Sequence, residues 1–206
     1  MNTPQIVSIS EDVFEHFPIH LHVDIRFCVE DDLHVLEWFG LFTEHREIIQ
    51  QAFEAQQRGE NIMLVAEANT LPVAQAWIDL LKRKEESAGF IWAVRVIPWL
   101  QNLGIGAKMM AAAEQVCARR GLAFAELGVE KENHEAKRFY ERQGYRLVGS
   151  LKEEYSYTTP DNRSITVPLD EWILRKPLSQ HPDGSRVVER DHGNGSSPTE
   201  AAQHHA

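Results

Sequence analysis

A glycine-containing loop between an expected strand and an expected helix is the most informative stretch of this 206-residue chain, and residues 94–106 read VRVIPWLQNLGIG. Such a loop directs several backbone N–H groups at one point, where the following helix adds partial positive charge. Gly104 and Gly106 also remove the Cβ atoms that would keep a ligand away from the main chain. This arrangement suits binding of a phosphate or pyrophosphate, although a tight strand-to-helix turn would give the same pattern.

Two motifs in this order resemble those of the GNAT acetyltransferases, and the resemblance covers residues 19–178. The first is similar to the family's acyl-CoA pyrophosphate loop and reads Gln101-x-x-Gly104-x-Gly106, preceded by Val96-x-Pro98. The second is similar to a helix that carries a tyrosine and ends at a glycine, and it reads Asn133-x-x-Ala136-x-x-x-Tyr140-x-x-x-Gly144-Tyr145. The first motif lacks both the Lys-Ser or Lys-Thr pair of a Walker loop and the third glycine of a dinucleotide-binding fingerprint.

The resemblance implies that acetyl-CoA binds as co-substrate, without a metal. The residues it assigns to this cofactor are Val94, Val96, Gln101, Asn102, Leu103, Gly104, Ile105, Gly106, Ala107, Lys108, Asn133, Lys137 and Tyr140. Asn133 is explained equally well as the cap of its helix. The basic side chains near the two motifs are explained equally well as solvated cations on helix faces, namely Lys108, Lys137 and Arg138.

Acetyl transfer to an amine requires an oxyanion donor, an acid for the leaving thiolate and removal of the amine's proton. We expect the donor to be a main-chain N–H of the strand before the loop, at Val94. In the family, a tyrosine at the position of Tyr140 lies near the sulfur of CoA. A phenol with a pKa of about 10 can protonate a thiolate with a pKa of about 8.5; the alternative is a core aromatic.

The expected base is the point at which the sequence departs from the family. The two positions at which members carry a glutamate are occupied by Phe90 and Gly128. Glu126 lies two residues before Gly128, hence on the same face of its strand, and is the candidate base and acceptor contact. A salt-bridged Glu126, a role for Asp79, and ordered water acting as the base stay open.

The acceptor pocket is expected between aromatic side chains. Trp92 should face the same side as Phe90 and Val94, where it would wall the pocket or belong to the core. Tyr155 and its neighbour Tyr157 would reach the acceptor from the last hairpin. A metal site is not expected, because the histidines near the N-terminus lack partners at ligand spacing, namely His16, His20 and His22.

Hydrophobic periodicity predicts the elements that position these residues. Strands are expected at 19–29, 61–68, 71–81, 88–97, 122–129, 145–157 and 164–175. Helices are expected at 31–39, 43–59, 104–120 and 134–143. This order predicts an α/β GNAT fold with a mixed, mostly antiparallel sheet of about seven strands and about four helices. In that fold, strands 88–97 and 122–129 separate to admit acyl-CoA, with a bulge expected around 94–97.

Composition predicts one globular domain, residues 19–178, between an N-terminal arm, 1–18, and a disordered tail, 179–206. The net charge of −10 disfavours nucleic acid as a partner. No apolar run has the 18 or more residues that a membrane span needs, and no signal peptide precedes the domain. We therefore expect a cytoplasmic protein without membrane contact whose Cys28 and Cys117 are reduced and mostly buried.

The sequence thus predicts an N-acetyltransferase that moves an acetyl group from acetyl-CoA to a primary amine, by direct attack in a ternary complex. A small-molecule amine is the first expectation for the acceptor. A protein N-terminus or lysine is the alternative. A sensor or interaction module that binds acyl-CoA without turning it over is the reading from another class, and a homodimer stays open.

Overall fold

The computed structural model describes residues 20–179. The predicted N-terminal arm (1–18) lies outside the described residues, as does the predicted tail apart from its first residue. The proposed domain boundaries therefore stay predictions.

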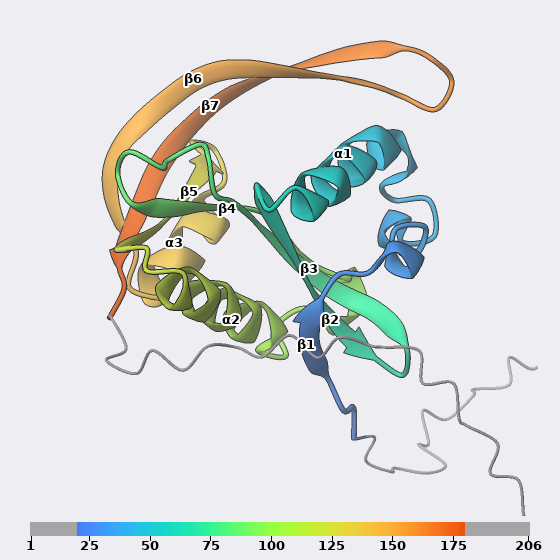
Figure 1. Ribbon diagram of the computed structural model, residues 1–206, viewed down its shortest axis with the longest axis horizontal. Helices are drawn as coiled ribbons and strands as arrows, with labels where there is room; N and C mark the ends of the chain where they lie inside the picture. Colours follow the sequence, from blue (N-terminus) through green and yellow to red (C-terminus); the bar gives the residue numbers. More distant parts are fainter. Residues whose placement is uncertain (1–19, 180–206) are drawn as a thin grey trace, which may run out of the picture.

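A seven-stranded sheet forms the centre of the fold, in the order β1-β2-β3-β4-β5-β7-β6 (Figure 1). Only the β4–β5 pair is parallel, and the other neighbours are antiparallel. The fold class is confirmed. The strands are β1 Asp24–Phe27, β2 Asn61–Ala68, β3 Leu71–Asp79, β4 Ala88–Val96, β5 Phe124–Glu130, β6 Arg146–Thr158 and β7 Ser164–Pro177.

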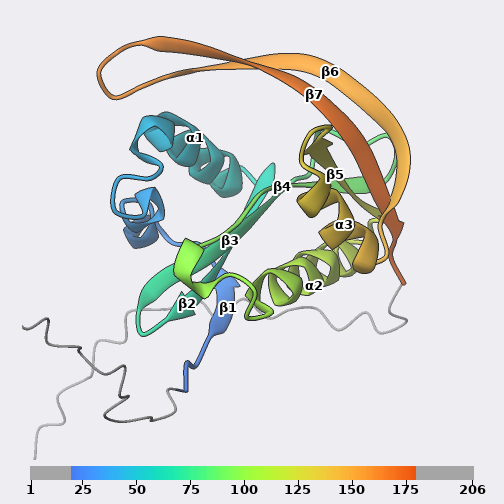
Figure 2. The same cartoon turned by 180° about the vertical axis from the view of Figure 1, so that it is seen from behind.

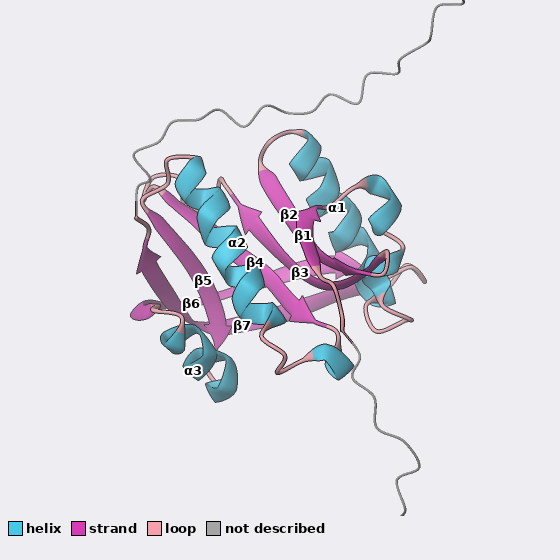
Figure 3. Cartoon of the chain, turned by 90° about the horizontal axis from the view of Figure 1, so that it is seen from below, coloured by secondary structure: helices cyan, strands magenta, loops and turns pink. Residues whose placement is uncertain are grey.

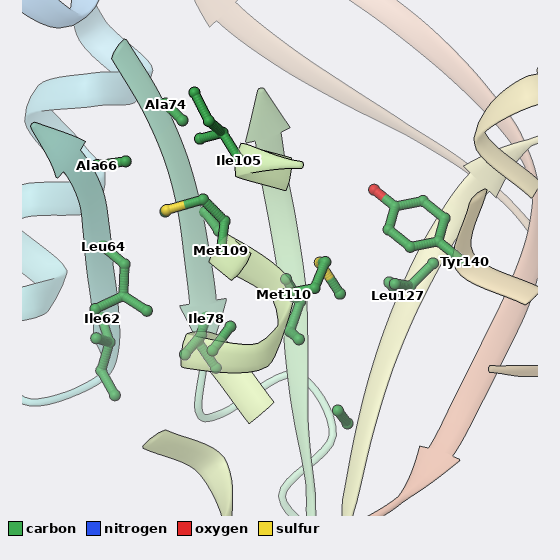
Figure 4. Packing of buried hydrophobic residues seen from close by; sticks show 14 of the residues in the cluster. Ile62, Leu64, Ala66, Ala74, Ile78, Ile105, Met109, Met110, Leu127 and Tyr140 are labelled. Carbon is green, nitrogen blue, oxygen red and sulfur yellow. The ribbon is translucent and has the colours of Figure 1, made fainter. Parts of the chain in front are cut away.

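Helices cover both faces of the sheet (Figures 2 and 3). The helices α2 (Ile105–Arg119) and α3 (His134–Arg142) lie on one face, and α1 (Arg46–Gln57) lies on the other. The larger core packs under α2, whose Met109 and Met110 are fully buried against β2 to β5 (Figure 4). A second core lies under α1. The sheet is therefore buried on both sides at its centre, where the site must form.

The segment expected to form a helix at 31–39 forms two short 3-10 helices instead, η1 (Glu30–Asp32) and η2 (Val35–Glu37). Trp38 and Phe39 have φ angles of 42° and 57°, which end any right-handed helix. A third 3-10 helix, η3 (Thr43–His45), leads into α1.

One extra residue in β4 changes which side chains face the site. Gln75 pairs with Arg95 and Trp77 with Trp92, so two residues of β4 face the single residue Ala76 of β3. This is a β-bulge, and Ala93 within it has a φ of 50°. The bulge falls at Ala93 and Val94, at the N-terminal edge of the expected segment.

The bulge corrects the expected position of Val94. Val94 packs against the core under α2, whereas Trp92 packs under α1. The two side chains therefore lie on opposite faces, because the extra residue shifts the alternation of the strand by one. Arg95 takes the place on the α1 side that unbroken alternation would have given to Val94.

Two features open a space beside the bulge. The β4–β5 ladder ends at Ile91 and Leu127, although both strands continue beyond these residues. The long β6–β7 hairpin curves over the sheet to α1 (Figure 1). There the Thr158 N–H donates to the Glu47 carboxylate, and His45 stacks on Tyr157 with ring centroids 5.1 Å apart.

Candidate active site

The N-terminus of α2 presents a series of free N–H groups. Gly104, at the cap position, has a φ of 84°, which glycine adopts at little cost. The first bond of the helix runs from the Lys108 N–H to the Gly104 carbonyl. Within residues 20–179, the N–H groups of 102–107 have no hydrogen-bond acceptor. They form the kind of anion site that pyrophosphate requires.

Other predicted cofactor residues hold this loop in place or surround it. The Gln101 side chain donates to the Val96 carbonyl at 3.0 Å and ties the loop to β4. The Asn133 side chain accepts from the Ala136 N–H at 3.0 Å and caps α3. Lys137 pairs with Glu141 in its own helix. The exposed Lys108 has no ion pair among the described residues and stays available for a phosphate.

Tyr140 lies in the core beside Leu127, and its hydroxyl points from α3 toward β4 (Figure 4). Burial raises the pKa of Tyr140 to about 12, so the phenol is protonated at neutral pH. Its hydroxyl has no hydrogen-bond partner in the part of the chain that the structure describes. The group is therefore free to donate to a ligand between β4 and β5.

A cavity of roughly 500 Å³ lies on the α1 side of the sheet, under the β6–β7 hairpin. Its floor includes Phe90, Trp92 and Gly128, and α1 contributes one wall. Tyr155 lines the cavity from the hairpin and stacks on Tyr157, with the two ring centroids 6.1 Å apart. The structure thus brings the predicted acceptor residues Trp92 and Tyr155 to one cavity. Trp92 is fixed there by its indole N–H, which donates to the Asn61 side chain at 3.3 Å.

Glu126 does not reach this cavity. Its side chain is 1% exposed and lies between Arg83 and Arg175, whose guanidinium groups are 2.7 and 2.6 Å from its oxygens. Both carboxylate oxygens of Glu126 are therefore engaged in ion pairs within the sheet. The structure therefore does not bring Glu126 together with the predicted acceptor residues Trp92 and Tyr155. Asp79 lines the cavity but accepts the N–H groups of Leu81 and Lys82, capping the turn after β3.

The carboxylate that faces the cavity comes from β7, at Glu171. A Cβ added to Gly128 would lie 2.2 Å from Oε2 of Glu171 and 2.7 Å from its Cδ. Glycine at position 128 thus leaves the space that the Glu171 carboxylate fills. Glu171 forms no ion pair within residues 20–179. Burial raises its pKa and Glu153 and Glu130 add to the rise, while Lys82 opposes it.

Sequence reasoning missed Glu171, because this residue enters the site through the pairing of β5 with β7. The one signal was Gly128, at a position where the family resemblance implies a carboxylate in some members. An empty space of that size on a buried strand has to be filled by some neighbour.

The two cysteines and the possible metal ligands are the remaining candidates for chemistry. Cys28 and Cys117 are buried, and burial raises the pKa of each to about 12, which keeps both thiols protonated and unreactive. Among the described residues, no three His, Cys, Asp or Glu side chains are placed to hold a metal ion. No helix in this part of the chain is long and apolar enough to cross a membrane.

The sequence model of the acetyltransferase (GNAT) family matches residues 31–145, more than half of the chain. The chain therefore belongs to the GNAT family and is an acyl-CoA-dependent N-acyltransferase. An uncharacterized N-acetyltransferase of Archaeoglobus fulgidus is 30% identical over 139 residues, which are 60% of this chain and 93% of the relative.

Solved structures share the fold at low identity. The ribosomal-protein-S18-alanine N-acetyltransferase of Escherichia coli has a TM-score of 0.56 and 18% identity over 81% of this chain and all of its own. The PaiA N-acetyltransferase of Thermoplasma acidophilum, in complex with coenzyme A, has a TM-score of 0.56 and 14% identity over 76% of this chain and 99% of its own.

We predict that Gly104→Asp raises the Kd for acetyl-CoA by at least about 10-fold, because it sets a negative charge against the pyrophosphate at a helix N-terminus. Calorimetry measures the change. Gly59→Asp is the control, since Gly59 has a similar φ of 75° and open space around it, so it reproduces the strain away from the loop. Equal affinity in wild type and Gly104→Asp would contradict the site.

Proposed function

We propose that the chain transfers an acetyl group from acetyl-CoA to the primary amine of a small molecule, by direct attack in a ternary complex. The observation that carries this proposal is the Glu171 carboxylate over Gly128, facing the cavity under the hairpin. The free N–H groups before α2 would hold the pyrophosphate. The acyl arm would run between β4 and β5, past Tyr140, to the edge of the cavity.

In this mechanism Glu171 removes the proton that blocks attack. A lysine-like amine has a pKa of about 10.4 and enters as an ammonium ion. The raised pKa of Glu171 lies closer to the pKa of the substrate amine than that of an ordinary carboxylate does, which favours proton transfer. The freed nitrogen bonds to the thioester carbon, and a strand N–H near the β4 bulge stabilises the oxyanion. As the C–S bond breaks, the nitrogen passes its second proton to solvent water.

Tyr140 then protonates the leaving thiolate, giving CoA and the N-acetyl amine. Desolvation weakens the phenol as an acid, since its pKa is raised to about 12. A thiolate released into the same buried region is destabilised for the same reason. The proton transfer is therefore less uphill than the separate pKa values imply.

The path to the cavity favours a small acceptor over a protein. The hairpin tip is anchored to α1 and η3, through Glu47 and through the pair of Glu44 with Arg163. A protein chain would have to pass under this arch. The activity named for the Escherichia coli neighbour favours a protein N-terminus as the second candidate.

Exchanging Glu171 for Gln tests the base. The amide cannot accept the proton, so we expect kcat with the best amine to fall by about 10²-fold or more. In the wild type, kcat/KM should rise with pH through the pKa of Glu171, above the usual carboxylate range, and the variant should lose this acidic limb. Glu154→Gln, an exposed glutamate on the same hairpin that does not line the cavity, is the control. An unchanged pH profile in Glu171→Gln would exclude Glu171 as the base.

The acid is tested by Tyr140→Phe, which removes one hydroxyl and keeps the ring. We expect kcat to fall by about 10²-fold with little change in KM or acetyl-CoA affinity, because the interaction acts mainly in the transition state. Tyr145→Phe is the matched control, since Tyr145 is a neighbouring buried tyrosine whose ring lies 6.0 Å from that of Tyr140. An unchanged kcat would remove Tyr140 from the mechanism. Acetyl-CoA binding without turnover of any amine would favour the sensor.

A further inference from the structure

The cavity has a second charged end, at Arg95. This residue follows the bulge in β4 and lines the cavity together with His45 and Tyr155. The Arg95 side chain forms no hydrogen bond and no ion pair with any residue from 20 to 179. An arginine that lines a cavity without a carboxylate partner is unusual, since desolvated charges are normally paired.

The neighbours of Arg95 leave its charge uncompensated. Burial lowers the pKa of Arg95, and the one titratable group that opposes this effect is the phenol of Tyr155. Gln75 lies directly across the β3–β4 ladder, but its amide is neutral. That amide is fully buried and lacks a partner among the described residues. Neither Tyr155 nor Gln75 thus supplies a carboxylate to Arg95.

The geometry of Arg95 leaves its donors free. The guanidinium carbon lies 4.3 Å from the centre of the Phe42 ring, a cation–π contact that holds the group in place. The N–H donors of the guanidinium have no acceptor among the described residues. A planar fork of donors fixed in this way matches a carboxylate, which it can bind with two parallel hydrogen bonds.

Arg95 and Glu171 lie at different places along the cavity. Glu171 pairs with Leu151 of β6, and Tyr155, the neighbour of Arg95, lies four residues further along that strand. Four residues of a strand span about 13 Å. The cavity is therefore polarised, with an unpaired carboxylate near one end and an unpaired guanidinium near the other.

We propose that the acceptor carries an anionic group, most simply a carboxylate, which binds Arg95 while its amine is presented at Glu171. This inference rests on the proposed acetyl transfer and narrows its substrate to amines that also bear a negative charge. Such a molecule neutralises both ends of the cavity, whereas a plain amine leaves Arg95 uncompensated. The anionic group can belong to a free amino acid or to an acidic residue near the N-terminus of a peptide.

The test compares matched acceptors that differ only in charge, by release of CoA thiol. One arm uses amino acids of increasing length against their amides: β-alanine, 4-aminobutyrate and 6-aminohexanoate. The other uses peptides with Glu or Gln at the second position and an amidated C-terminus. We expect wild type to favour the acid by about 10- to 100-fold in kcat/KM, the usual effect of a charged hydrogen bond. The arm with the larger preference identifies the source of the carboxylate.

Variants show whether Arg95 causes the preference. Arg95→Gln should remove the acid–amide difference and leave the Kd for acetyl-CoA unchanged, and Arg95→Lys should restore part of the difference. Arg58→Gln, an exposed arginine at the end of α1, should keep it in full. Turnover of amines with no acid preference in wild type would overturn the anionic acceptor while leaving acetyl transfer intact. A preference that persists in Arg95→Gln would overturn the role of Arg95.

If no amine is turned over, a binding measurement tests whether Arg95 forms an anion site. Calorimetry would compare N-acetyl-4-aminobutyrate with its amide on the protein–CoA complex. Tighter binding of the acid in wild type but not in Arg95→Gln supports the anion site even without catalysis. Equal binding of acid and amide overturns it.

Discussion

The extra residue at Ala93 and Val94 in β4 is the constraint on which the site depends. It breaks the alternation of the strand, so that Val94 and Val96 turn to the α2 core while Arg95 turns to the cavity. The β4–β5 ladder ends just before it, at Ile91 and Leu127. One local irregularity thus lies where the β4–β5 ladder ends, beside the proposed path of the acyl arm, and it gives the two faces of β4 different residues. Val94 and Val96 pack into the core on the α2 face, and the charged Arg95 lines the cavity on the α1 face.

The second feature is the position of the carboxylate in the cavity, which comes from Glu171 of β7 and lies over Gly128 of β5. The family resemblance implies that some members carry a glutamate where this chain has Gly128, and the Glu171 carboxylate occupies the space that a side chain there would need. In the proposed mechanism the base therefore comes from the neighbouring strand β7, and glycine at position 128 leaves room for it. The same comparison explains Glu126, which lies on the predicted face but is held by Arg83 and Arg175 in the sheet.

The fold and the phosphate loop could be predicted from the sequence because their signals are local. Strand 61–68 matches β2 in both bounds, and the glycine-led helix begins within one residue of its expected start. The acceptor side could not be predicted to the same depth. Glu171 reaches Gly128 only through the β5–β7 pairing. The face on which Val94 lies depends on the exact position of the bulge, because moving the bulge by one residue would turn Val94 to the other face. Trp38 and Phe39 ended the first expected helix by a left-handed turn that periodicity does not encode.

The most direct test of the account moves the carboxylate back to β5. Glu171→Ala should lower kcat by about 10²-fold, and adding Gly128→Glu should recover at least about 10-fold of that loss. The acidic limb of the pH profile should return with it, because the new side chain enters the vacated space. Acetyl-CoA affinity, measured in parallel, should be equal in all three proteins. A folded double variant that binds acetyl-CoA but is no more active than Glu171→Ala would contradict the claim that positions 128 and 171 share one catalytic carboxylate.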